Sequence, residues 1–236
     1  PQLVSKLIAI FSIFLTISGV SMFLNKNLRN IFLPIVSKVY KKNNVILLNN
    51  LYKETTFIIN IISIPISIII IFFSSNIIDL FDKSEFAINY IHLLHILIFT
   101  KIISLLFGNT GVYMLMAGFE KNDVYIQFVK TIFSILFSII LIKQYQLEAI
   151  VFIFMISSIG VNLFQFLILN KHLKLNPFSK ELFFLILLTI VIISIYYIFN
   201  FSMRIIFIFP FSMLIFSIYY ISFRNKISDL IKKSKK

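Results

Sequence analysis

Two long stretches without any charged residue limit most strongly what this chain can fold into. Residues 56–78 and 182–199 consist mainly of Ile, Leu and Phe and contain no Asp, Glu, Lys or Arg. A helix of about 18 or more such residues is long enough to cross the hydrocarbon core of a bilayer. Hydrophobic residues make up 59% of the 236 residues, whereas ordinary soluble domains contain about 45–50%. The sequence therefore predicts an all-α fold, a polytopic bundle of transmembrane helices.

The alternation of apolar runs and polar connections predicts about seven spans. The expected spans are 3–24, 56–81, 90–123 (with a tight turn at 120–123), 125–141, 149–169, 182–199 and 205–223. Four regions follow from these spans. They are 1–43 (the first span and a basic connection), 44–177 (a helix bundle), 178–223 (two further spans) and 224–236 (a basic tail).

The apolar character of residues 3–40 extends too far for a single span. As one helix they would measure about 57 Å, nearly twice the hydrocarbon thickness. The helix is therefore expected either to tilt and protrude or to break, at the polar patch 25–30 or at Pro34. An amphipathic segment, 45–52, follows, and Pro65 is expected to kink the second span.

The net charge of +13 lies mainly between and after the apolar runs. This distribution is typical of cytoplasmic loops, and it leaves no soluble face for a nucleic-acid partner. The basic connections after the first and fifth spans and the C-terminal tail are placed in the cytoplasm. The connections after the second, fourth and sixth spans are placed outside. The chain then enters from outside, so further spans are expected upstream of Pro1.

Lys101 is the first candidate for a functional residue, because it lies in the middle of the third expected span. A cation at this depth costs about 2.5–3.5 kcal/mol on insertion scales, so it usually faces a bundle interior or a wet cavity. One interpretation is a cavity cation that attracts an anionic substrate. The other is a structural lysine that snorkels or forms hydrogen bonds.

Lys26 and Arg29 are the second candidates and share a helical face with Asn25. If the first helix is continuous, Arg29 would lie deep enough to line a substrate cavity. If the helix breaks at the polar patch, both cations would be anchors at the membrane interface, where they cost little.

Small and polar residues within the spans suggest packing and hydrogen-bonding roles. Gly108, Gly111 and Gly118 interrupt the third span, where they would act as hinges or allow close helix packing. Three polar residues within spans are expected to form hydrogen bonds between helices, namely Asn60, Asn162 and Gln165.

Residues for catalysis, metal binding or ion coupling are not apparent. His92 and His95 are three residues apart without a further ligand, so no metal site is expected. No Asp or Glu lies in the middle of an expected span, and no nucleotide-binding motif occurs. The sequence therefore predicts neither an enzyme nor a cofactor.

Two motifs resemble a known family of transporters. The first is Pro–x–x–Ser–Lys–x–Tyr in 32–40 (FLPIVSKVY), followed by an amphipathic segment, 47–53 (LLNNLYK). The second is Gly–x–x–Gly…Leu–Met–x–Gly–x–x–Lys in 108–121. In this order and spacing, they are similar to the C-terminal half of polysaccharide and O-antigen flippases, over residues 28–177. That family belongs to the superfamily of multidrug and oligosaccharidyl-lipid exporters.

The resemblance implies a two-lobed transporter of which this chain is the second lobe, with the N-terminal lobe as its partner. It implies undecaprenyl-linked oligosaccharide as the substrate and the bacterial inner membrane as the location. Two other functions are considered: a cation-coupled exporter of small molecules from the same superfamily, and a non-transporting membrane subunit that anchors a partner through its basic tail.

Overall fold

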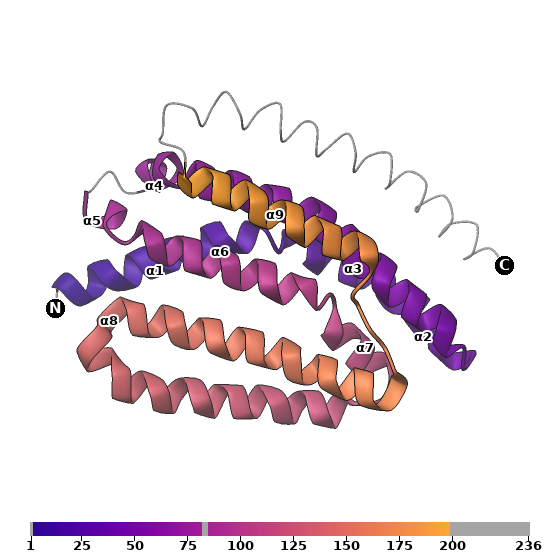
Figure 1. The fold of residues 1–236 in the computed structure, drawn as a ribbon. Coiled ribbons are helices and arrows are strands. Elements are labelled where there is room, and N and C mark those ends of the chain that lie inside the picture. Colours follow the sequence, from indigo (N-terminus) through magenta and orange to yellow (C-terminus); the bar gives the residue numbers. More distant parts are fainter. Residues whose placement is uncertain (1, 82–84, 199–236) are drawn as a thin grey trace.

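The computed structural model describes residues 2–81 and 85–198, whereas residues 1, 82–84 and 199–236 lie outside that description. Within the described residues the chain is helical and contains no strand, which confirms the all-α prediction (Figure 1). The seventh expected span, 205–223, and the basic tail, 224–236, lie outside the described residues.

The first apolar region is divided into α1 (Gln2–Val20) and α2 (Phe23–Lys41). The break falls at Ser21 and Met22, immediately before the polar patch, and α2 continues through Pro34. The Ser21 hydroxyl donates to the Ser18 carbonyl oxygen over 2.7 Å. Hydroxyls that bond to nearby carbonyls in this way compete with the regular helix. Of the alternatives left open by the sequence, the break beside the polar patch is the one observed.

The second span is a single helix, α3 (Val45–Phe72), which includes both the amphipathic segment and Pro65. It begins at Asn44, whose side-chain oxygen accepts a hydrogen bond from the Leu47 N–H over 2.9 Å, a regular N-cap. A short helix, α4 (Ser74–Phe81), follows after a turn at Phe73. The predicted span 56–81 therefore starts later than α3 and extends past the end of α3 through α4.

The third span is interrupted as predicted, between α6 (Ile91–Leu106) and α7 (Thr110–Met116), after the short helix α5 (Glu85–Ile88). The tight turn predicted at 120–123 is wrong, because these residues form the first turn of α8 (Glu120–Leu173). The chain turns instead at Gly118, whose φ of +77° suits glycine.

The fourth and fifth spans are the two limbs of α8, which reverses direction at Gln146 (φ 44°, ψ −118°). This reversal falls in the polar connection 142–148 between the two expected spans. The two limbs run side by side, and α9 (Lys180–Ile198) then crosses to lie over α3 (Figure 1).

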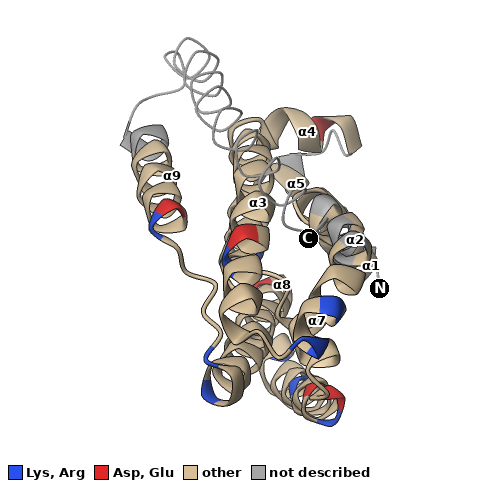
Figure 2. Cartoon of the chain, turned by 90° about the vertical axis from the view of Figure 1, so that its right-hand side faces the viewer, with Lys and Arg blue, Asp and Glu red and all other residues tan. Residues whose placement is uncertain are grey.

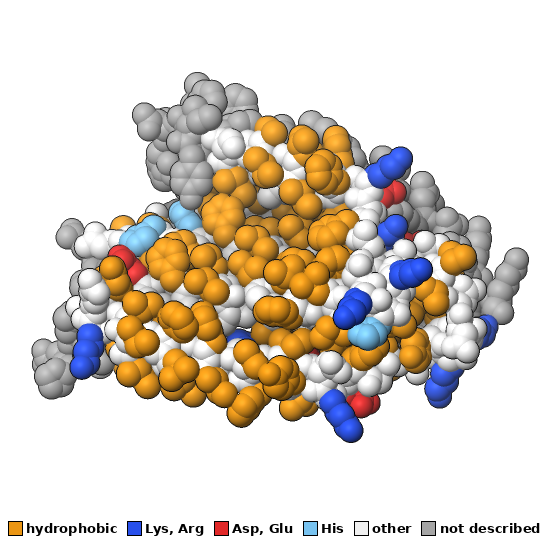
Figure 3. All heavy atoms as spheres, turned by 60° about the horizontal axis from the view of Figure 1, so that its bottom comes forward, with side chains coloured by type: hydrophobic (Ala, Val, Ile, Leu, Met, Phe, Trp, Pro, Cys, Tyr) orange, Lys and Arg blue, Asp and Glu red, His pale blue; other side chains and the backbone are white. Residues whose placement is uncertain are grey.

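The core lies around α3, which contacts α1, α2, α6 and α9, while α8 packs against α6 and α7. Among the described residues, three helical stretches are long and apolar enough to cross a membrane: Val45–Phe72, Ile91–Met116 and Glu120–Leu173. The first limb of α8 leaves large apolar side chains exposed, among them Phe128, Leu136, Ile139 and Ile140. Figure 3 shows hydrophobic side chains spread over one face of the molecule. Such a surface suits lipid better than water.

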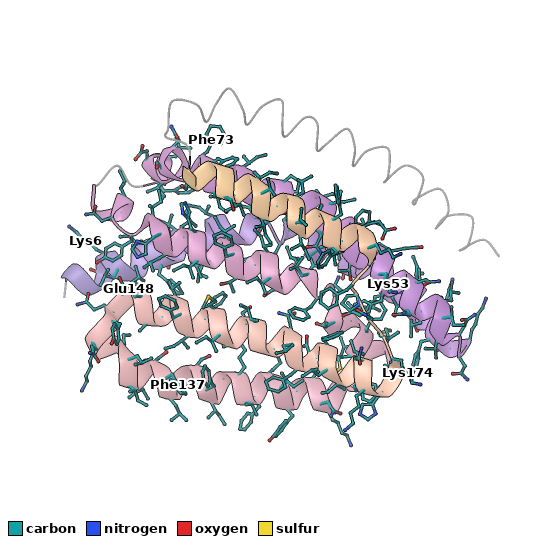
Figure 4. All side chains as sticks on the ribbon, in the orientation of Figure 1. Lys6, Lys53, Phe73, Phe137, Glu148 and Lys174 are labelled. Atoms are coloured by element: carbon teal, nitrogen blue, oxygen red, sulfur yellow. The ribbon has the colours of Figure 1, made fainter. Side chains whose placement is uncertain are left out.

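Most Lys and Arg side chains lie toward one end of the molecule (Figure 3), the end that faces the viewer in Figure 2. Figure 4 shows Lys53 and Lys174 near this end, and Lys6, Phe73 and Glu148 near the other. This basic end contains the α2–α3, α7–α8 and α8–α9 connections (Figure 1). The Tyr40 hydroxyl donates to the Ala117 carbonyl oxygen over 3.3 Å, and the Asn176 N–H donates to the Asn49 side chain over 2.8 Å. The connections that the charge pattern predicts as cytoplasmic are therefore on one side.

Candidate functional site

A polar stripe on α3 supports the break between α6 and α7. Tyr52, Thr56 and Asn60 follow each other at intervals of four residues and are fully buried on one helical face. The Tyr52 hydroxyl donates to the Phe107 carbonyl oxygen over 2.6 Å. The Asn60 amide donates to the Leu105 carbonyl oxygen over 2.7 Å. Carbonyl groups at the end of α6, where the helix hydrogen bonds stop, are thus satisfied by α3.

Gly108 allows the two helices to approach at the break. Its φ of +69° lies in the left-handed region, where side chains other than glycine are strained. A Cβ at this position would overlap the Thr56 hydroxyl oxygen. The position therefore requires glycine both for its backbone conformation and for its contact with α3.

A polar cavity of about 190 Å³ lies beside this break. Its lining comes from the start of α2, the α6–α7 break and both limbs of α8. The lining residues are Met22, Asn25, Ser104, Gly108, Asn109, Thr110, Gly111, Val112, Asp123, Gln127, Asn162 and Gln165. A cavity of this polarity and size is suited to hold water.

Three residues of the cavity lining form a chain of hydrogen bonds, which we call the Thr110–Gln165–Asp123 network. The Thr110 hydroxyl donates to the Gln165 Oε1 over 2.5 Å, and the Gln165 Nε2 donates to the Asp123 Oδ1 over 2.5 Å. The Thr110 hydroxyl also lies 3.4 Å from the Asn162 Oδ1. The network ties α7 to both limbs of α8 and fixes the orientation of the Gln165 amide.

Two further side chains of the cavity lining retain unused hydrogen-bonding capacity. Among the described residues, the buried Oδ1 of Asn25 and Nδ2 of Asn109 have no hydrogen-bond partner. Buried polar groups usually have a partner, and an unpartnered group costs about 1–3 kcal/mol. The cavity therefore offers one free acceptor and one free donor to water or a ligand.

The interhelical hydrogen bonds predicted for Asn60, Asn162 and Gln165 are confirmed. Gly108 and Gly111 line the cavity, whereas Gly118 forms the α7–α8 turn. Pro34 and Pro65 lie inside continuous helices, so neither interrupts its span.

Lys101 is the predicted cation whose side chain the structure describes. Lys101 is half-buried on α6, with its Nζ 4.6 Å from the centre of the Phe154 ring, a cation–π geometry. The described residues that line the cavity do not include it. Lys26 and Arg29 lie near the start of α2, and their side chains lie outside the described ones.

Asp123 and Gln127 are the site residues that sequence reasoning missed. Asp123 was expected to lie in the tight turn 120–123, at the end of a span, and was therefore not a candidate. The structure places it in the first turn of α8, where it faces the cavity with Gln127 one helical turn later. Their spacing of four residues places them on one face at the start of α8, and this is the signal that would have revealed the polar face.

The histidines lie at the opposite end of the bundle. His92 Nε2 is 3.9 Å from the Glu148 carboxylate, so an acid does lie near it, contrary to expectation. The His95 Nε2 lies 3.0 Å from the Ser74 hydroxyl. The described residues contain no group of three or more His, Cys, Asp or Glu that could hold a metal ion.

Comparisons with family models, with curated proteins and with solved structures gave no match for this chain. The features that bear on its function are therefore the polar cavity and the apolar helices around it.

Proposed function

We propose that the chain is an integral membrane protein and forms the second lobe of a transporter for lipid-linked oligosaccharide. The observation that supports transport is the polar cavity at the α6–α7 break, within helices long and apolar enough to cross a membrane. Irregular backbone and polar side chains are tolerated at membrane depth where they line a water-filled cavity. Such a cavity offers a polar group a path that lipid does not.

The location and orientation belong to the same proposal. The basic end of the bundle lies in the cytoplasm of a bacterial cell, in line with the positive-inside bias, and the α8 bend lies outside. The two lobes alternate in access around a central path, while the lipid tail of the substrate stays in the bilayer.

The substrate class, undecaprenyl-linked oligosaccharide, comes from the resemblance of the two sequence motifs. The cavity lining is compatible with it, because amides and hydroxyls can exchange hydrogen bonds with sugar hydroxyls. In this arrangement the sugar part, rather than the pyrophosphate, meets the cavity, because Asp123 is the only formal charge among its described lining residues.

Deletion of the gene tests the proposal. We expect loss of surface polysaccharide and accumulation of its lipid-linked precursor. Complementation with Asn162→Leu, which places an apolar side chain in the cavity, should fail. Phe164→Leu, an exposed apolar position two residues further along α8, should complement at the same membrane level.

A cation-coupled exporter of small molecules is the second candidate, and Asp123 is the observation in its favour. A carboxylate in a membrane cavity is a usual site for ion or proton coupling. Intact surface polysaccharide after deletion, together with increased sensitivity to toxic compounds, would support this candidate and contradict the flippase.

A further inference from the structure

Three polar side chains on α3 are completely buried and keep hydrogen-bonding groups without a partner. Thr56, Asn60 and Ser63 are each 0% exposed. Among the described residues, the Thr56 hydroxyl, the Asn60 Oδ1 and the Ser63 hydroxyl form no hydrogen bond. Buried polar groups in folded proteins nearly always have a partner, which is either another protein group or an ordered water. These three groups therefore require a partner that the described part of the chain does not supply.

Helix geometry places the three groups beside each other. Their spacings of four and three residues put them on one face of α3, with neighbouring Cβ atoms about 5–6 Å apart. The same face is directed at α6, because the Asn60 Nδ2 donates to the Leu105 carbonyl oxygen over 2.7 Å and Thr56 contacts Gly108. The three groups thus form a row about 10 Å long in the α3–α6 interface.

The hydrogen bonds of the Asn60 amide fix its orientation. The Nδ2 also donates to the Thr56 carbonyl oxygen over 2.8 Å, so both amide hydrogens are bound to carbonyl oxygens. The exchanged orientation would place the amide oxygen against two carbonyl oxygens, which cannot donate. The Asn60 Oδ1 is therefore the atom that lacks a partner, and it needs a donor.

A water molecule fits between Asn60 and Ser63. It donates one hydrogen bond to the Asn60 Oδ1 and shares a second with the Ser63 hydroxyl. Two hydrogen bonds of ordinary length bridge the separation of neighbouring positions on a helix. Buried waters typically bind polar groups that otherwise lack a partner in this way. A metal ion fits less well, because three neutral groups would leave its charge unbalanced in the interior.

We propose that the α3–α6 interface is a water-binding site, in which at least one ordered water molecule bridges the Asn60 Oδ1 and the Ser63 hydroxyl. Gly108 connects this site with the polar cavity, because it lines the cavity and also lies against the Thr56 hydroxyl. Hydration then extends from the cavity past the α6–α7 break and along α3. The site goes beyond the proposed function and does not depend on it.

The sign of the stability change in Ser63→Ala tests the site. With a bound water, the alanine removes one of its hydrogen-bond partners, so the melting temperature of the purified full chain should fall by about 2–4 °C. In a dry interface, the same change removes an unpartnered buried hydroxyl, and the melting temperature would stay the same or rise. Thermal unfolding in detergent distinguishes the two results.

A double-mutant cycle tests whether Asn60 is the second partner of the water. In the Asn60→Leu background, Ser63→Ala should lower the melting temperature by less than about half as much as in the unmodified chain, because the bridge is already lost. Ser67→Ala is the matched control. This serine is equally buried, but its hydroxyl donates to the Ser63 carbonyl oxygen over 2.8 Å. Its effect should be the same in both backgrounds.

A crystal structure grown from a lipid phase gives the direct measurement and does not depend on any variant. We expect an ordered water about 2.5–3.2 Å from both the Asn60 Oδ1 and the Ser63 hydroxyl oxygen. Three results would overturn the proposal. They are ordered side chains with no water between them, an unchanged or raised melting temperature in Ser63→Ala, and an equal effect of Ser63→Ala in both backgrounds. Normal surface polysaccharide after gene deletion would contradict only the proposed function.

Discussion

Thr56 on α3 and Gly108 at the α6–α7 break are in such close contact that any Cβ at position 108 would overlap the Thr56 hydroxyl oxygen. On either side of this contact, Tyr52 and Asn60 donate hydrogen bonds to the carbonyl oxygens of Phe107 and Leu105. Contacts from α3 thus stabilise the interruption of the third span. The polar cavity lies beside this interruption.

Gly108→Ala should destabilise the protein by about 2–6 kcal/mol, because a left-handed backbone conformation costs about 1–3 kcal/mol for other residues and overpacking adds about 1–3 kcal/mol. Gly111→Ala is the matched control, because a Cβ there would meet the Gln165 Nε2 at an ordinary 3.9 Å. Thermal unfolding in detergent measures both variants. Thr56→Ala should restore part of the stability of Gly108→Ala, and equal stability of the two glycine variants would contradict the contact.

Asn60→Leu should lower the free energy of unfolding by about 0.5–1.5 kcal/mol, because it removes the hydrogen bond from α3 to the Leu105 carbonyl oxygen, which keeps only the one from the Gly108 N–H. Asn122→Leu changes the same residue type at an exposed position on α8 and should stay within about 0.5 kcal/mol of the unmodified protein. Denaturant titration compares the two. Indistinguishable values would show that the hydrogen bond does not stabilise the break.

Lys101 and Phe154 should show a coupling energy of about 0.5–2 kcal/mol in a double-mutant cycle with Lys101→Met and Phe154→Leu, because the ammonium lies over the ring. Lys101→Arg should keep most of this stability, because the guanidinium also binds aromatic faces. Zero coupling together with lost transport in Lys101→Met would instead support the interpretation of Lys101 as a substrate-binding cation.

The orientation can be mapped directly, because the chain contains no cysteine. Single cysteines at Lys42 and Lys174 report on the basic end, and one at Lys143 reports on the α8 bend. A membrane-impermeant thiol reagent added to intact cells should label only the cysteine at position 143. Labelling of the cysteines at positions 42 and 174 but not at 143 would show that the protein has the opposite orientation.

The elements of this fold were largely predictable, because hydrophobic runs, prolines and glycines act locally. The uncharged runs predict the long helices, and the polar residues 143–148 predict the reversal observed at Gln146. The end of α3 was not predictable from hydropathy alone. The residues after Phe72 remain uncharged as far as Ile78, and α4 begins with Ser74, whose hydroxyl donates to the Ile71 carbonyl oxygen over 2.8 Å.

The site was less predictable than the fold, because it depends on contacts between distant parts of the chain. The sequence singles out Lys101 as an isolated charge in an apolar span, but the structure places it over Phe154. Asp123 follows Glu120 and Lys121 closely in the sequence, and such a polar cluster predicts a turn. Its bond to Gln165 requires the two limbs of α8 to fold back on each other, 42 residues apart in sequence.

If the proposed function is correct, the polar cavity is an aqueous compartment inside a membrane-spanning bundle. Labelling of single cysteines at Asn162 and Phe164 with a small, water-soluble thiol reagent in native membranes tests it most directly. The two positions lie within about 3 Å of the same depth along α8, but Asn162 lines the cavity whereas Phe164 is an exposed apolar side chain. We predict rapid labelling at 162 and little or none at 164. Equal labelling at both positions, or labelling at 164 alone, would contradict the claim.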